Sequence, residues 1–145
     1  MDRPEDRMYD PTQAAIQKVG AAIVRDNKIL VVRKKKQEGE EYIMPGGRME
    51  GGETQRETLY RELHEELGVD VAAYDYLGTF SDIAVFEGEP LIIHAYVVEV
   101  DGEMTPQAEL GELRWIDAHF QEQGIKVGSI MAKKVIPRMV SLGRM

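Results

Sequence analysis

Three glutamates within one short stretch, Glu62, Glu65 and Glu66, are the side chains of this sequence best suited to chemistry. In an α-helix, positions i, i+3 and i+4 lie on one side, so the three carboxylates would form a single acidic cluster. Like charges at these spacings repel, and carboxylates near the end of a helix oppose its dipole. A divalent cation would make this arrangement favourable, and carboxylate oxygens suit Mg²⁺ or Mn²⁺. The spacing therefore indicates a metal site; the competing interpretation is a solvated acidic face with ion pairs such as Glu57 to Arg61.

The helix that would carry these glutamates has recognisable ends. Thr54 and Glu57 have the spacing of a capping box, and Gly68 can supply the left-handed residue that ends a helix. The helix would be amphipathic, with an apolar stripe at every fourth position: Leu59, Leu63 and Leu67. The sequence thus predicts a helix whose one face packs on a core while another carries the carboxylates.

The stretch from Gly47 to Val69 resembles the Nudix box. It reads GRMEGGETQRETLYRELHEELGV, and every fixed position of that motif is filled at the right spacing. By this motif the chain is identified as a member of the Nudix hydrolase family. The resemblance implies an α/β class fold, a Nudix-type α/β/α sandwich with a mixed sheet, in which the box forms a loop–helix–loop. It also implies a magnesium-dependent enzyme that cuts a phosphoanhydride bond.

The resemblance further implies roles for individual residues of the box. By motif position, Glu62 and Glu66 are the best candidates for metal ligands, with Glu65 next and the Gly47 carbonyl as an additional ligand. Arg61 resembles the residue that orients these carboxylates by ion pairing. Water would attack a phosphorus of the anhydride, and Glu62 or Glu65 would accept its proton.

A further carboxylate is often supplied by a loop downstream of the box in this family. Glu103, Glu109 and Glu112 compete for that role, and Glu109 is favoured because it precedes the apolar-aromatic segment LRWI. Glu53, at the start of the predicted helix, is expected to be structural, since the helix dipole favours an acidic side chain there.

Four other residues are candidates for contacts with substrate. Arg33, at the end of a predicted strand, and Arg48, after a glycine pair, could contact phosphates. Phe80 and Phe86 could stack on a base, although core packing is the competing role for each aromatic. His94 lies in the middle of a predicted strand, and we expect it to be structural.

Two subfamily markers help to choose among substrates. The proline typical of ADP-ribose hydrolases is replaced by Ala84 and Val85, and the tyrosine typical of diadenosine polyphosphate hydrolases is replaced by Phe86. The layout is more similar to MutT-type enzymes, which convert a nucleoside triphosphate to a monophosphate and pyrophosphate; oxidised dGTP is one candidate. Dinucleoside polyphosphates and nucleotide sugars stay open as substrates. The alternative from another class is a non-catalytic nucleotide-binding Nudix domain, but such domains usually lose box glutamates that this chain keeps.

The remaining elements are predicted from hydrophobic patterning and turn residues. Two antiparallel strands are expected at 19–24 and 29–32 around a turn at Asp26-Asn27, and a short strand at 42–44 is stopped by Pro45-Gly46-Gly47. Further strands are expected at 71–80, 91–100 and 113–116, and a second helix at about 128–138. The order of strands, helix, strands and helix indicates a mixed sheet flanked by helices. Residues 1–16 are expected to be a flexible or loosely docked lead-in, and residues 17–145 one domain.

Composition restricts the function further. The absence of cysteine excludes disulfides, thiolate nucleophiles and cysteine-ligated zinc. A formal net charge of −8 disfavours binding to long nucleic acids, and a polyanionic nucleotide is compatible with it only if metal is present. No apolar run approaches the ~20 residues of a membrane span. We therefore expect a cytoplasmic enzyme with a small nucleotide substrate, no membrane partner, and a monomeric or homodimeric state.

Overall fold

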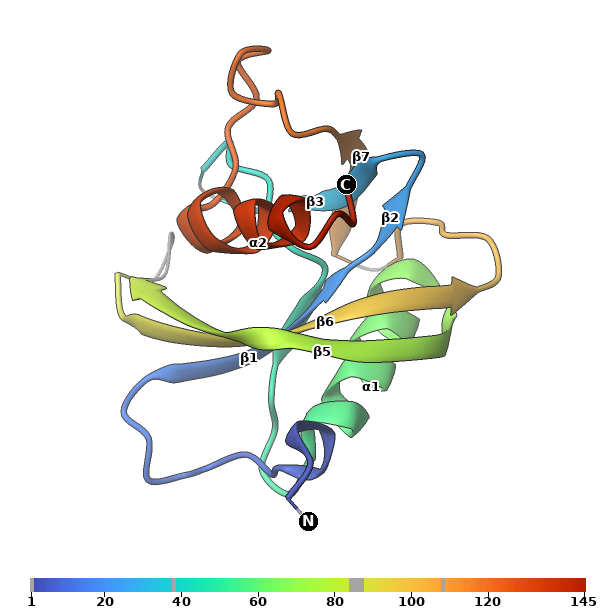
Figure 1. Ribbon diagram of the computed structural model, residues 1–145. Helices are drawn as coiled ribbons and strands as arrows, with labels where there is room; N and C mark the ends of the chain where they lie inside the picture. The colour runs from blue at the N-terminus through green and yellow to red at the C-terminus, as the bar shows by residue number, and fades with distance from the viewer. Residues whose placement is uncertain (1, 38, 84–87, 108) are drawn as a thin grey trace.

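The structure, a computed structural model, describes residues 2–37, 39–83, 88–107 and 109–145, and places helices on both sides of a central sheet (Figure 1). Within these residues, a four-stranded sheet has the order β4 (Gly46–Arg48), β1 (Ile16–Ala22), β6 (Pro90–Asp101) and β5 (Asp70–Ile83). A three-stranded sheet has the order β2 (Val24–Arg25), β3 (Lys28–Lys34) and β7 (Leu110–Ile116). The helical segments are the 3-10 helix η1 (Pro4–Asp6), α1 (Gln55–Leu67), the π-helical η2 (Met131–Val135) and α2 (Ile136–Ser141).

The four-stranded sheet is mixed and lies between two helical layers. Strand β1 runs parallel to β6, whereas β1 with β4 and β5 with β6 are antiparallel. Side chains alternate between the two faces of a strand, so Val19 and Ala21 pack in one apolar cluster while Ala22 packs in another. The first cluster contains the leucine stripe of α1: Leu59, Leu63 and Leu67. The second contains side chains of η2 and α2: Met131, Val135, Ile136 and Met139. This arrangement confirms the predicted α/β/α sandwich with a mixed sheet.

Helix α1 begins and ends where the sequence predicts. The Thr54 side chain accepts a hydrogen bond from the Glu57 N–H at 3.1 Å, and the Glu57 carboxylate accepts one from the Thr54 N–H at 3.0 Å. Gly68 has φ 67°, a left-handed conformation in which a side chain would be strained. These local signals fix the ends of the helix that carries the glutamates.

The predicted antiparallel pair 19–24 and 29–32 is only partly correct. Residues 19–22 belong to β1, which pairs with β4 and β6 rather than with β3. Of the predicted run 19–24, only its last residue, Val24 of β2, pairs with β3, across a turn in which Asp26 and Asn27 have φ of 51° and 61°. The run divides between two sheets because β1 takes its partners from segments distant in the sequence.

The glycine pair expected to stop a strand instead starts one. Gly46 opens β4 with φ 135°, and a Cβ there would lie 2.1 Å from the Val19 carbonyl oxygen. Glycine therefore permits the close approach of β4 to β1. In place of the predicted short strand at 42–44, Tyr42 and Ile43 make isolated bridges, with Val127 and Val32 respectively.

The C-terminal helix starts close to the predicted start and ends later than predicted. Helical residues run from Ser129 through η2 and α2 to Ser141, beyond the predicted end at about 138. Pro137 lies in the first turn of α2, directly after the π-helical segment, where a proline is tolerated. Among the residues that the structure describes, no helix has the length and apolar character needed to cross a membrane.

The lead-in makes specific contacts with the start of α1. The Tyr9 N–H donates to the Glu53 carbonyl at 2.9 Å, and the Gln55 N–H donates to the Arg7 carbonyl at 2.9 Å. The segment expected to be flexible or loosely docked is thus hydrogen-bonded to the loop that precedes the glutamate helix.

Candidate active site

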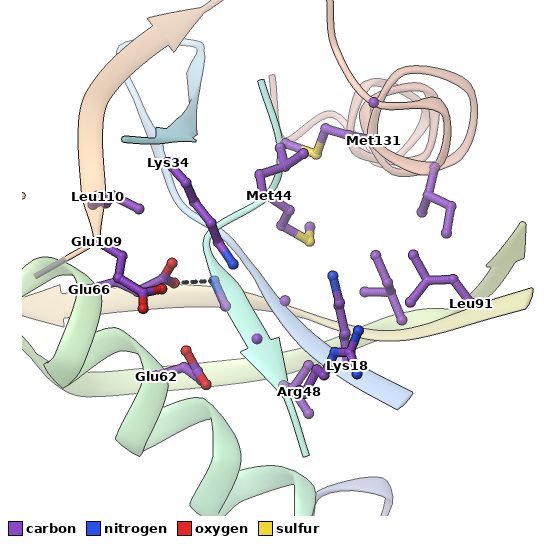
Figure 2. A pocket seen from close by; sticks show the side chains of 18 of the residues that line it. Lys18, Lys34, Met44, Arg48, Glu62, Glu66, Leu91, Glu109, Leu110 and Met131 are labelled. Carbon is purple, nitrogen blue, oxygen red and sulfur yellow. Dashed lines mark hydrogen bonds between the residues drawn. The ribbon is translucent and has the colours of Figure 1, made fainter. Parts of the chain in front are cut away.

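Two glutamates of α1 lie directly against the glycine pair of β4. The Gly46 N–H donates a 2.7 Å hydrogen bond to Oε1 of Glu66, drawn as a dashed line in Figure 2. The Glu62 carboxylate lies so close to the Gly47 Cα that a Cβ there would be 2.4 Å from Glu62 Cδ. Glycine at position 47 is therefore required for Glu62 to occupy its place.

Burial makes both carboxylates harder to ionise. The pKa of Glu66 is raised to about 7, chiefly because burial disfavours the charge, and the hydrogen bond from Gly46 offsets only part of this effect. Burial also raises the pKa of Glu62, although the neighbouring Arg61 acts in the opposite direction. A cation bound between these groups would stabilise their charged forms.

Arg61 links the loop before α1 to the glutamate cluster. Its Nε and Nη2 donate to the two carboxylate oxygens of Glu53 at 2.6 and 3.0 Å, a bidentate pair. Its Nη1 donates to Glu62 at 2.8 Å and to Glu65 at 3.4 Å, and its Nη2 also donates to the Arg48 carbonyl at 3.0 Å. The hydrogen bonds from Arg61 lower the pKa of Glu53 to about 2, so Glu53 is ionised at neutral pH.

A cavity of about 520 Å³ lies beside these residues, and its lining has three chemical parts. The acidic part consists of Glu62, Glu65, Glu66 and Glu109, and the basic part of Lys18, Lys34 and Arg48. The apolar part includes Met44, Leu91, Ile93, Ile130 and Met131. Figure 2 shows the glutamates gathered at one side, the Lys34 ammonium next to them, and the methionines and Leu91 toward the other side. Carboxylates, cations and an apolar surface thus line a single cavity.

Six residues predicted for the site line this cavity: Gly47, Arg48, Glu62, Glu65, Glu66 and Glu109. Arg61 is not part of the lining, but it donates hydrogen bonds to Glu62 and Glu65. Of the competing downstream glutamates, Glu112 accepts a hydrogen bond from the Tyr42 hydroxyl, away from the cavity lining.

Two of the residues predicted to contact substrate lie elsewhere. The Arg33 guanidinium lies 4.3 Å from the centre of the Tyr42 ring and donates to the Glu40 carbonyl at 2.8 Å. Phe80 packs against the apolar core from β5 and covers Gly78. Neither side chain lines the cavity among the described residues. Phe86 lies outside the residues that the structure describes.

No local pattern in the sequence points to Lys18 and Lys34, the two lysines of the lining. Alternation along β1 indicates that Lys18 and the buried Val19 face opposite sides of the sheet. That signal becomes informative only once β1 is known to lie beside β4 and its glycine pair.

The His94 side chain has its Nδ1 3.0 Å from the Thr79 hydroxyl oxygen, and burial lowers its pKa to about 4. It therefore stays neutral at pH 7.

The donor set suits a hard divalent cation, although the side chains do not enclose a metal position. No group of three acidic or histidine side chains among the described residues is compact enough to hold an ion as it stands. Four carboxylates nevertheless line one cavity, and two of them are partly buried with pKa values raised by that burial. Mg²⁺ needs only one or two carboxylates and keeps several waters, so this donor set fits it.

Comparisons with known proteins agree with this geometry. The model of the protein family described as "NUDIX domain" matches residues 16–124 of this chain. The CTP pyrophosphohydrolase of Escherichia coli (strain K12) is 34% identical over 57% of this chain and 62% of its own length. A putative 8-oxo-dGTP diphosphatase 2 of Mycobacterium tuberculosis is 32% identical over 69% of this chain and 72% of its own length. The chain spans between 52% and 62% of the length of the first curated relatives that it matches.

A solved structure supports the same assignment. The solution structure of the E. coli ORF135 protein superposes with a TM-score of 0.66 and 27% identity, covering 89% of each chain. The family match extends over most of the sequence and includes the entire glutamate helix. This protein is therefore a member of the Nudix hydrolase family.

Proposed function

We propose that this chain hydrolyses a phosphoanhydride bond of a nucleoside triphosphate in a Mg²⁺-dependent reaction, releasing a nucleoside monophosphate and pyrophosphate. The observation that carries the proposal is the chemistry gathered in one cavity: four carboxylates, the cations Lys18, Lys34 and Arg48, and an apolar group of side chains, with the glutamates and Met131 toward opposite sides. A nucleoside triphosphate bound to metal presents three matching parts, the cation, the phosphates and the base.

The cations and the carboxylates of the cavity would have different roles in this reaction. Lys18, Lys34 and Arg48 bind and orient the phosphates, because ammonium and guanidinium groups form strong hydrogen bonds with phosphate oxygens. Glu62 or Glu65 accepts the proton of the water that attacks phosphorus, while the bond from phosphorus to the bridging oxygen breaks. A bound Mg²⁺ would neutralise the developing charge and lower the pKa of that water.

Arg61 supports this reaction without touching the substrate. Its bidentate pair with Glu53 anchors the guanidinium, and its third nitrogen holds the carboxylate of Glu62. Positioning of this kind keeps a ligand carboxylate in the geometry that the reaction requires. Two relatives reported above carry names of enzymes acting on CTP and on 8-oxo-dGTP, which supports a triphosphate as the substrate here.

The net charge supports a small substrate, and a cytoplasmic location stays a prediction. A charge of −8 repels long nucleic acids, whereas the lysines and arginine of the cavity are enough for one triphosphate group. The oligomeric state, monomer or homodimer, stays a prediction.

A substrate panel tests the proposed function. Nucleoside triphosphates, dinucleoside polyphosphates and nucleotide sugars are each incubated with the protein and Mg²⁺, and products are separated by anion-exchange chromatography. We expect monophosphate and pyrophosphate from the triphosphates, and no turnover in excess chelator. Full turnover with chelator would contradict the metal requirement. Preferential cleavage of another substrate class would replace the triphosphate assignment.

A further inference from the structure

At the apolar end of the cavity, the side chain of a methionine packs directly against a glycine of the central sheet. A Cβ on Gly20 would lie 2.2 Å from the Met44 sulfur, 3.0 Å from Met44 Cγ and 3.3 Å from Ile93 Cγ2. Real side chains do not pack at the shortest of these separations, so Met44 occupies the space that any side chain at position 20 would fill. Both residues line the cavity.

The backbone does not require a glycine at position 20. Gly20 lies inside β1, hydrogen-bonded on both sides in register with Gly46 and Ala95, and it is not among the described glycines with positive φ. A glycine inside a central strand weakens the strand and commonly marks a place where another group approaches closely. The group that approaches here is the thioether of Met44.

Met44 lies beyond Lys34 as seen from the glutamates, at a place where a base could enter the cavity. Figure 2 shows it between Lys34 and Met131. Met44 and Met131 belong to the same apolar cluster, and both line the cavity. Thioethers are polarisable, unbranched and adaptable, and they make favourable contacts with the edges of aromatic rings. This chemistry suits a flat nucleobase.

We infer that Met44, which packs against the Cα of Gly20, sets the depth of the base subsite and thereby the preference of the enzyme between purine and pyrimidine nucleotides. This inference rests on the proposed function, because it concerns the same cavity. In the Gly20→Ala variant the new methyl group displaces the flexible Met44 side chain into the cavity and shortens the subsite. In Met44→Ala the subsite is lengthened, and the same methyl group at position 20 no longer meets the thioether.

The test is a double-mutant cycle on base preference. For the wild type, Gly20→Ala, Met44→Ala and the double variant, kcat/KM is measured with GTP and with CTP in the presence of Mg²⁺. Binding of GMP and CMP is measured by calorimetry on the same samples. We expect Gly20→Ala to lower the GTP to CTP ratio by about 10-fold, the size of effect typical for one methylene in a tight pocket. In the Met44→Ala background, the same glycine change should leave the ratio unaltered.

Met139→Ala is the matched control. Met139 is fully buried in the same apolar cluster but does not line the cavity, so its truncation should lower the melting temperature and leave base preference unchanged. If Gly20→Ala fails to fold, the Met44→Ala variant alone tests the inference, because a longer subsite must change the ratio of kcat/KM for GTP to that for CTP.

Failure of the inference and failure of the proposed function give different results. Turnover of triphosphates with a ratio that neither variant changes overturns the inference and leaves the function intact. The inference is equally overturned if the glycine change has the same effect with and without Met44. Absence of turnover, combined with shifted GMP and CMP binding, overturns the function and leaves the inference standing. If the wild type neither turns over nor binds these nucleotides, both are overturned.

Discussion

The Glu62 carboxylate fills the space above the Cα of Gly47, where a Cβ would lie 2.4 Å from Glu62 Cδ. An alanine at position 47 must therefore displace Glu62 from the cavity wall. For Gly47→Ala we expect kcat to fall by roughly 10²-fold, as when one group that stabilises a transition state is lost. The control is Gly51→Ala, because a Cβ on Gly51 meets none of the described atoms within 4 Å. Equal activity of the two variants would show that the placement of Glu62 is unimportant.

The Glu66→Gln variant separates a metal ligand from a surface carboxylate. Glutamine keeps the shape of the side chain but removes one negative charge from the proposed metal site. We expect kcat to fall at least ~10²-fold. The metal-free melting temperature should hold or rise, because repulsion with Glu62 one turn away is relieved. Wild-type kcat in this variant would support the interpretation as a solvated acidic face.

Arg61→Lys tests whether the guanidinium positions the carboxylates. Lysine keeps the charge but loses the bidentate pair with Glu53 and the simultaneous bond to Glu62. We expect activity to fall by about 10- to 100-fold, as for other residues that orient metal ligands. The free energy of unfolding should fall by about 1 kcal/mol. Arg56→Lys, on the same helix but paired with the exposed Asp6, is the control and should keep full activity.

Lys34 and Arg33 are adjacent in β3 but are expected to differ in function. Lys34 lines the cavity, whereas Arg33 lies over the Tyr42 ring outside it. We expect Lys34→Met to raise KM for the triphosphate by about 10-fold, since a charge-assisted hydrogen bond to phosphate is lost. Arg33→Met should leave KM unchanged and lower the melting temperature. A larger rise in KM for the Arg33 variant would place the phosphates on the other side of the strand.

The raised pKa of Glu66 predicts how stability depends on pH without metal. Its pKa is about 7 in the folded protein against an ordinary value of 4.5, so between these values the folded state binds more protons than the unfolded state. The contribution of Glu66 to the free energy of unfolding therefore decreases as pH rises through this window. In chelator, the melting temperature of Glu66→Gln should exceed that of the wild type by a margin that grows from about pH 4.5 to about pH 7.

His94 makes the comparison with Glu66→Gln necessary. The pKa of His94 is lowered to about 4 from 6.5, so its contribution to stability is lost as pH falls through that range. This effect is opposite in sign to that of Glu66 and is present in both proteins. It cancels in the difference between them. A difference that is independent of pH would mean that the Glu66 carboxyl titrates normally.

The helix of the site could be predicted from the sequence because its determinants are local. The capping box, the leucine stripe and the terminal glycine all act within one or two turns, and helical geometry alone places Glu62 and Glu66 on one side. The complete box also identified the family, and hence the sandwich fold.

The tertiary structure alone decided which other residues join that helix. Strand pairing is non-local: β1 pairs with β4 and β6 instead of β3, and this pairing brings Lys18 beside the glycine pair. Arg33 is predicted from the sequence to contact phosphates, but a register shift lies between it and Lys34, and of the two only Lys34 lines the cavity. The packing of Met44 against Gly20 likewise brings together two residues that no local sequence pattern connects. Helical periodicity is set by neighbouring residues, whereas the face of a strand side chain has meaning only after the partners of that strand are known.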